Sequence, residues 1–166
     1  MRRNLCACLA VCFLFSVADA QTKEIVLDFV AEGPRLDGVL DDACWQSAVP
    51  VKDFLDLKTR QAARRGTEVR LLMTPEGLYF GAVLFDEDPA RIVAASRKHD
   101  DKIWQDDEFE ILIYPTRKEG EYFHFLMNAA GSREDWRGPK DIQWNARPDW
   151  QVAVAKRKDA WVCEGL

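Results

Sequence analysis

Apolar and polar residues alternate with a period of two along most of this sequence, which is the pattern of half-buried β-strands. The alternating runs lie at residues 25–30, 69–73, 78–85, 109–113, 122–127, 150–155 and 160–163. Pro75 and Gly77 separate the second run from the third and predict a hairpin turn there. Helical patterns are limited to 41–47, with Asp41 as its cap, and 88–95. We therefore predict an all-β fold, an antiparallel β-sandwich of the jelly-roll type, with one or two short helical turns.

Residues 1–20 have the features of an export signal. Arg2 and Arg3 precede an apolar run at 5–17, and Ala18-Asp19-Ala20 matches the small-x-small pattern of a cleavage site. The apolar run is shorter than a membrane-spanning helix requires. We predict cleavage near Ala20, a secreted or periplasmic protein without a membrane span, and one domain over residues 21–166.

The charge balance narrows the range of partners. The chain holds 28 acidic and 23 basic residues, which gives a net charge of −5. Nucleic acids and anionic membrane surfaces attract proteins with clustered Lys and Arg, whereas the basic residues here are scattered along the chain. We therefore expect no nucleic-acid partner.

Two of the five cysteines, Cys44 and Cys163, lie outside the predicted signal. In an oxidising compartment they could pair or stay free, and their separation in the sequence does not decide between these alternatives.

The candidate chemistry lies in KIWQDDEFEILIYP, residues 102–115. Trp104 precedes an acidic run, in which Glu108 and Glu110 share one face of the predicted strand. An exposed indole can stack on the apolar face of a sugar ring while carboxylates accept hydrogen bonds from its hydroxyls. Alternatively, Trp104 plugs one end of the sandwich and the acids are only solvated. Glu108 and Glu110 could also be the carboxylate pair of a glycosidase, but an acidic strand is ordinary in an acidic protein, so we predict no catalytic residues.

Asp86 and Asp88 lie in an acidic loop, DEDP. Carboxylates on loops are ligands that Ca²⁺ prefers. The alternative is a pair of solvated loop acids that bind no ion.

Five segments occur here in the order seen in family 9 carbohydrate-binding modules, a part of the wider DOMON-like group, and the sequence resembles that family. They are LDGVLDDACWQSA (36–48), TEVRLLMTPEGLYFGAVLFDEDP (67–89), KIWQDDEFEILIYP (102–115), YFHFLMNAAGSREDW (122–136) and WVCEG (161–165). The resemblance implies a non-catalytic β-sandwich that binds the ends of glucan or xylan chains and carries structural calcium, with Asp86 and Asp88 in the matching region.

The resemblance also implies roles for single residues. In the family pattern W-x-x-D-x-x-E, the tryptophan forms one side of an aromatic clamp and the glutamate hydrogen-bonds the sugar. The matching residues are Trp104, Asp107 and Glu110, and Asn128 matches the family pattern F-x-x-N. We therefore take Trp104, Glu110, Asp107 and Asn128 as candidate carbohydrate-binding residues.

The sequence departs from the family at two points. Leu126 stands where the family can use an arginine, and the second clamp tryptophan belongs to a part of the family that follows residue 166. The segment 161–166 reads as an unfinished strand, so we expect the domain to lack its last strands.

Two alternatives remain open. Some DOMON-like domains transfer electrons through a haem held by methionine and lysine, and Met73 and Met127 lie in predicted strands, although a core position explains both methionines more simply. The chain could also be the truncated N-terminal module of a larger cell-envelope protein.

Overall fold

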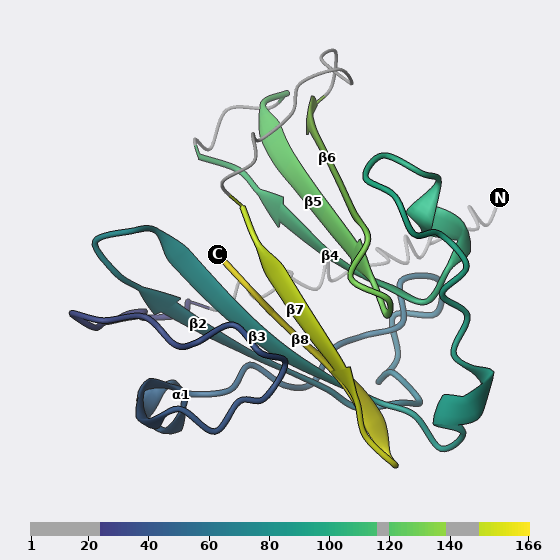
Figure 1. Ribbon diagram of the computed structural model, residues 1–166, viewed down its shortest axis with the longest axis horizontal. Coiled ribbons are helices and arrows are strands. Elements are labelled where there is room, and N and C mark those ends of the chain that lie inside the picture. Colours follow the sequence, from purple (N-terminus) through teal and green to yellow (C-terminus); the bar gives the residue numbers. More distant parts are fainter. Residues whose placement is uncertain (1–23, 116–119, 139–149) are drawn as a thin grey trace, which may run out of the picture.

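Two β-sheets pack face to face in this structure (Figure 1). It is a computed structural model that describes residues 24–115, 120–138 and 150–166, so the predicted export signal lies outside the described residues. The elements in chain order are β1 (Asp28–Phe29), α1 (Ala43–Ser47), β2 (Thr67–Met73), β3 (Leu78–Phe85), η1 (Pro89–Arg91), η2 (Ile103–Gln105), β4 (Glu108–Ile113), β5 (Tyr122–Asn128), β6 (Arg133–Gly138), β7 (Val152–Lys156) and β8 (Ala160–Gly165).

The larger sheet has the strand order β1-β2-β3-β8-β7, and the smaller has the order β4-β5-β6. All pairs are antiparallel except β1 with β2, which is parallel. β8 lies between β3 and β7, so the segment nearest the carboxyl end of the described chain occupies an interior position of the sheet. The predicted all-β sandwich is confirmed, with this one parallel pair as a difference.

The predicted hairpin between β2 and β3 is present. The N–H of Thr74 donates to the carbonyl oxygen of Gly77 across the turn at 2.9 Å. The Thr74 hydroxyl oxygen also accepts the N–H of Glu76 at 3.0 Å. The turn thus satisfies its own backbone groups. The hairpin that Pro75 and Gly77 predicted is confirmed.

The main core lies between the two sheets. Val69, Phe80, Trp161 and Cys163 come from the larger sheet and meet Met127 of the smaller one. The rings of Phe80 and Phe109 lie 5.9 Å apart, which joins the sheets directly. Val69 pairs with Ala82, which in turn pairs with Cys163, so these core side chains share one face of the larger sheet.

Three local predictions were wrong. Residues 25–30 form only the two-residue strand β1, whose Phe29 is exposed, because the edge of the sheet gives that side chain nothing to pack against. The helix α1 has Asp42 rather than Asp41 at its N-cap, and no side-chain cap bond forms. The helical segment expected at 88–95 is limited to the single turn η1.

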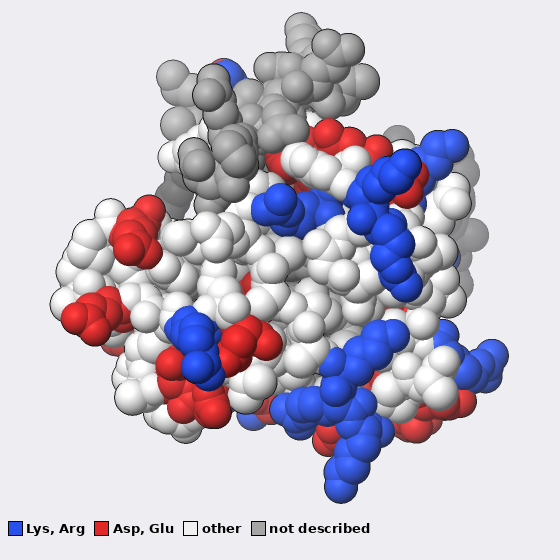
Figure 2. All heavy atoms as spheres, in the orientation of Figure 1, with Lys and Arg blue, Asp and Glu red and all other residues white. Residues whose placement is uncertain are grey.

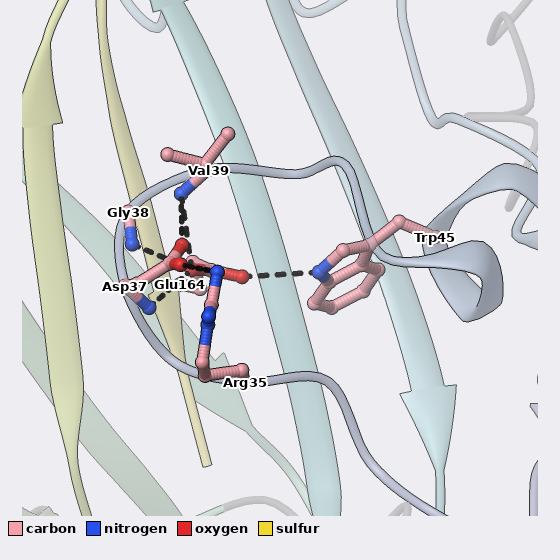
Figure 3. Close-up of polar contacts among 6 residues, drawn as sticks. All are labelled: Arg35, Asp37, Gly38, Val39, Trp45 and Glu164. Atoms are coloured by element: carbon pink, nitrogen blue, oxygen red, sulfur yellow. Dashed lines mark hydrogen bonds and ion pairs between the residues drawn. The ribbon is translucent and has the colours of Figure 1, made fainter.

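Glu164 of β8 fastens the loop before α1 to the larger sheet (Figure 3). Its carboxyl group is fully buried. One oxygen accepts the backbone N–H groups of Asp37, Gly38 and Val39 at 2.9, 2.6 and 3.2 Å. The other oxygen accepts the indole N–H of Trp45 at 3.0 Å. A single side chain therefore accepts hydrogen bonds from four donors. Two of them, the N–H of Gly38 and the indole N–H of Trp45, are buried and would be costly to leave without a partner.

Gly38 lets this loop approach the sheet closely. Its φ is +85°, and a Cβ at this position would lie 2.8 Å from the backbone nitrogen of Ala155 in β7. Any other residue would be strained by the backbone angle and would also collide with β7. The glycine is thus required for the contact between the loop and Glu164.

Cys44 and Cys163 are both free. Burial raises the pKa of the Cys163 thiol, which keeps it protonated and unreactive. Within the described residues, no helix is long and apolar enough to cross a membrane.

Candidate functional site

The outer face of the smaller sheet, which points away from the core, carries the candidate site. Directly paired residues share a face in an antiparallel sheet, and the register of β4, β5 and β6 places two rows of side chains next to each other on this face. One row is Leu112, His124 and Trp136, and the other is Glu110, Leu126 and Glu134. Aromatic and acidic groups thus lie side by side, which is an arrangement suited to a ligand with both apolar faces and hydroxyl groups.

Trp104 is presented by η2, a single helical turn that contacts β5. Its neighbour Ile103 is fully buried and anchors the turn, whereas the side chain of Trp104 is 52% exposed. Lys102 enters the turn with a left-handed φ of 42°. An indole exposed to this degree does not plug the end of the sandwich, which was the alternative interpretation of this residue.

Asp106 and Asp107 hold the loop before η2 rather than reaching out into solvent. Asp106 accepts the N–H groups of Ala95 and Ser96, both at 2.9 Å. Asp107 accepts the N–H of Val93 at 2.7 Å. Burial alone would raise the pKa of Asp106, but its hydrogen bonds outweigh this effect and hold the pKa below its usual range.

Asn128, one of the candidate carbohydrate-binding residues, lies below the surface of the protein. It is fully buried, and its amide nitrogen donates to Asp106 at 2.8 Å and to the carbonyl oxygen of Ser96 at 2.9 Å. Its amide oxygen accepts the N–H groups of Ala130 and Ser132. With its donors and acceptor occupied by the protein, Asn128 positions the loop that carries Trp104.

Glu110 lies on the open part of the outer face and is paired with His124. The Nε2 atom of His124 is 2.9 Å from a carboxylate oxygen of Glu110. The ring of Trp136 meets the imidazole edge-on, with centroids 4.1 Å apart. Since the imidazole is confined between Trp136 and the carboxylate, Glu110 has a fixed orientation from which it can accept hydroxyl groups of a ligand.

The sequence did not identify His124 and Trp136 as members of this site. His124 read as an ordinary strand residue between two phenylalanines, and β6 was not recognised as a strand. Once β4, β5 and β6 are aligned, the position of His124 beside Glu110 follows from their register. That register was the missing signal.

Tyr122 extends the aromatic side of the outer face. Its ring lies 5.5 Å from that of Tyr114, measured between centroids. It covers Gly138 so closely that a Cβ there would be 1.9 Å from a ring atom. Only glycine leaves room for the tyrosine ring at this point of β6.

Glu108 adds a group that titrates near neutrality. Burial, and then repulsion from Glu110, Glu134 and Asp106, raise the pKa of Glu108 to about 7. One of its oxygens is buried without a hydrogen-bond partner among the described residues. The acidic part of the outer face therefore gains negative charge as the pH rises through 7.

Glu108→Gln is expected to stabilise the protein above pH 7. Because the pKa is raised from its ordinary value of 4.5 to about 7, the folded protein binds more protons than the unfolded chain between these pH values, and stability falls as pH rises through that range. The gain at pH 8 should be about 1 kcal/mol, because the group is only partly buried. Melting curves at pH 5 and pH 8 would measure it. The control is Glu87→Gln, at an exposed site, which should lose as much stability between pH 5 and pH 8 as the wild type does. If Glu108→Gln lost the same amount as this control, the assignment would be contradicted.

Asp86 and Asp88, the candidate calcium ligands, lie in a loop rich in both charges. One oxygen of Asp86 pairs with Arg65 at 2.7 Å, and the other accepts the N–H of Asp88 at 2.7 Å. Figure 2 shows acidic and basic side chains next to one another over one face of the molecule. An ion at Asp86 would have to displace or tolerate the guanidinium, and calcium binding here stays a prediction.

A separate cleft of about 350 Å³ opens between the two sheets. Its lining is almost entirely apolar and includes Phe80, Ile111, Phe125 and Trp150. A sugar would find few partners there for its hydroxyl groups, and unpaired polar groups are costly to bury. The outer face of the smaller sheet is thus the better candidate for a carbohydrate site.

Comparison with known proteins agrees with this fold. No family model matches the chain, and no curated protein matches it. Among solved structures, a family 9 carbohydrate-binding module from Caldicellulosiruptor kristjanssonii in complex with glucose superposes with a TM-score of 0.58 at 16% sequence identity, covering 82% of this chain and 65% of the module. A module of this family from the same organism in complex with cellotriose superposes with a TM-score of 0.58 at 16% sequence identity, covering 84% of this chain and 66% of the module.

A third structure, from Bacteroides uniformis and attributed to a carbohydrate-binding protein, gives a TM-score of 0.64 at 11% identity, with 84% of this chain and 69% of that chain covered. This chain therefore spans about two thirds of the length of each solved structure. At these identities the comparison bears on the fold: the chain is folded like a family 9 carbohydrate-binding module.

Proposed function

We propose that this protein is an exported, non-catalytic module that binds the ends of glucan or xylan chains on the outer face of its smaller sheet. The observation that carries the proposal is the exposed indole of Trp104 on a turn that contacts β5, beside a face that holds Glu110 and His124. The solved structures with glucose and cellotriose, which share the fold, support sugars as the ligand class.

The two kinds of group have separate tasks. Trp104 offers an apolar plane that can stack on the C–H face of a sugar ring. Glu110, oriented by His124, accepts hydroxyl hydrogen bonds, which are stronger than neutral ones because the acceptor is charged. Leu126 cannot supply the arginine that the family can use and is itself buried, so His124 is the basic group nearest to this carboxylate among those described.

The haem alternative gains no support from the described residues. Met127 is fully buried in the main core, and Met73 belongs to the other sheet. Export through cleavage near Ala20 and a place within a larger envelope protein stay predictions.

The test is calorimetric titration with cellobiose and xylobiose, beside cellotriose and its borohydride-reduced alcohol. The wild type should bind, and binding that weakens with the alcohol identifies the reducing end as the recognised group. Glu110→Gln keeps the shape but removes the charge, and should weaken binding at least about tenfold. Glu87→Gln, at an exposed loop position outside the sheet, serves as the control and should bind like the wild type.

Two results would overturn the proposal. A folded wild type that gives no heat with any of these sugars would remove carbohydrate binding. Release of glucose from cellobiose during the titration would show that Glu108 and Glu110 act as a catalytic pair instead.

A further inference from the structure

Three potential metal ligands converge where the loop before η2 meets β6. They are His99, Asp100 and Asp135, whose nearest ligand atoms all lie within 4.8 Å of one another. The Nε2 atom of His99 is 2.9 Å from a carboxylate oxygen of Asp135 and 3.2 Å from one of Asp100. His99 and Asp100 are neighbours in the sequence, whereas Asp135 lies 36 positions after His99. The fold, rather than local sequence, brings them together.

The protein holds this cluster in place from two sides. The side chain of Asp135 is 0% exposed, on the inner face of β6, and accepts the indole N–H of Trp150 at 3.0 Å. The loop is bound to the same strand by the N–H of Asp100, which donates to the carbonyl oxygen of Arg133 at 3.0 Å. A ligating carboxylate fixed by a further hydrogen bond is the usual support of a protein metal site.

The donor set selects the class of metal. Zinc and similar ions bind imidazole nitrogen and carboxylate oxygen at 2.0–2.2 Å, so two ligands on one tetrahedral ion lie about 3.3 Å apart, and on an octahedral ion about 3 Å. The distances around His99 agree with this spacing. Calcium takes oxygen ligands at longer distances and has no use for the imidazole. Two carboxylates and one neutral imidazole also balance the charge of a divalent ion.

We propose that His99, Asp100 and Asp135 form a binding site for a divalent transition-metal ion of the zinc class. These three are the protein ligands that the described residues offer, and water can take coordination positions that they leave open. The ion would tie the loop that leads into η2 to β6. Because His99 and Asp100 are partly exposed, the ion can reach the site from solvent.

The test is titration of the untagged protein with Zn²⁺ in competition with a chromogenic chelator, in the absence of sugar. The wild type should bind one ion with a dissociation constant in the micromolar range or below, and saturating Zn²⁺ should raise the melting temperature by several degrees. His99→Ala should weaken binding at least about tenfold. Asp100→Asn should also weaken it, whereas Asp101→Asn, which changes the neighbouring exposed residue outside the cluster, should not.

Other outcomes would overturn the proposal. A folded wild type that binds no Zn²⁺ leaves His99 as an ordinary ion-pair partner of Asp135. Loss of binding in His124→Ala but not in His99→Ala would place the metal at the other histidine. A third possibility is that the metal binds the thiolate of Cys44. Titration with Co²⁺ would detect this, because a thiolate ligand gives charge-transfer absorption. None of these readouts depends on whether the protein binds a sugar.

Discussion

Glu164→Ala is expected to lower the melting temperature by on the order of 10 °C, or to leave the protein insoluble. The substitution removes the acceptor for the backbone N–H groups of Asp37 and Gly38 and for the indole N–H of Trp45, while the N–H of Val39 keeps a second acceptor, the carboxylate of Asp37. Each buried donor left without a partner costs about 1–3 kcal/mol, and water entering the cavity recovers part of that, so we expect a loss of about 3–5 kcal/mol. This is a large share of the usual stability of a domain. Thermal and urea unfolding measure it.

Controls separate this effect from a general sensitivity to charge removal. Glu87→Ala changes an exposed glutamate and should alter stability by less than about 0.5 kcal/mol. Trp45→Phe removes one of the four donors and should cost about 1–2 kcal/mol in the wild type, but less once Glu164 is gone. If the two substitutions were strictly additive, the hydrogen bond between Trp45 and Glu164 would not contribute to stability.

Trp104→Ala is expected to abolish measurable sugar binding, or to weaken it more than tenfold, without destabilising the fold. The indole supplies the flat apolar surface of the proposed site, and the loss of a stacked aromatic ring costs more than the buried area alone predicts. Since the side chain is 52% exposed, its removal should shift the melting temperature by no more than about 2 °C. Calorimetric titration with cellobiose, together with a melting curve, measures both quantities.

The matched control for this experiment is Phe29→Ala. Phe29 is exposed like Trp104 but lies in β1, at the edge of the other sheet, and its removal should leave sugar binding unchanged. Unaltered binding in Trp104→Ala would move the site away from η2. A large fall in melting temperature would instead mean that the indole serves packing.

The fold could be predicted from the sequence wherever one face of a strand is apolar. β2, β3, β4 and β5 show this alternation and were found. β6 was missed because its inner face carries Arg133, Asp135 and Arg137, so its burial leaves no apolar signal. The run at 25–30 failed for the opposite reason: its apolar side chains predicted burial, but the sheet edge gives them no partner.

The candidate site was predictable only in part, for a related reason. Trp104 and Glu110 stand in one short stretch, so a local pattern can identify them. The pairing of Glu110 with His124 and the contact of His124 with Trp136 depend on strand register. The partners of Glu164 are more than a hundred residues distant along the chain. Such contacts are set by the complete fold and leave no trace in neighbouring residues.

The interior position of β8 affects how the chain can fold as it is being made. β3 pairs with β8 along most of its length, so its edge stays open until residues 160–165 have been synthesised and are free to pair. During that interval the loop at 37–39 has no acceptor from Glu164. An open strand edge beside exposed apolar residues is the kind of surface that holding chaperones cover and that promotes aggregation. The larger sheet can therefore form completely only after β8 has been synthesised and has paired with β3 and β7.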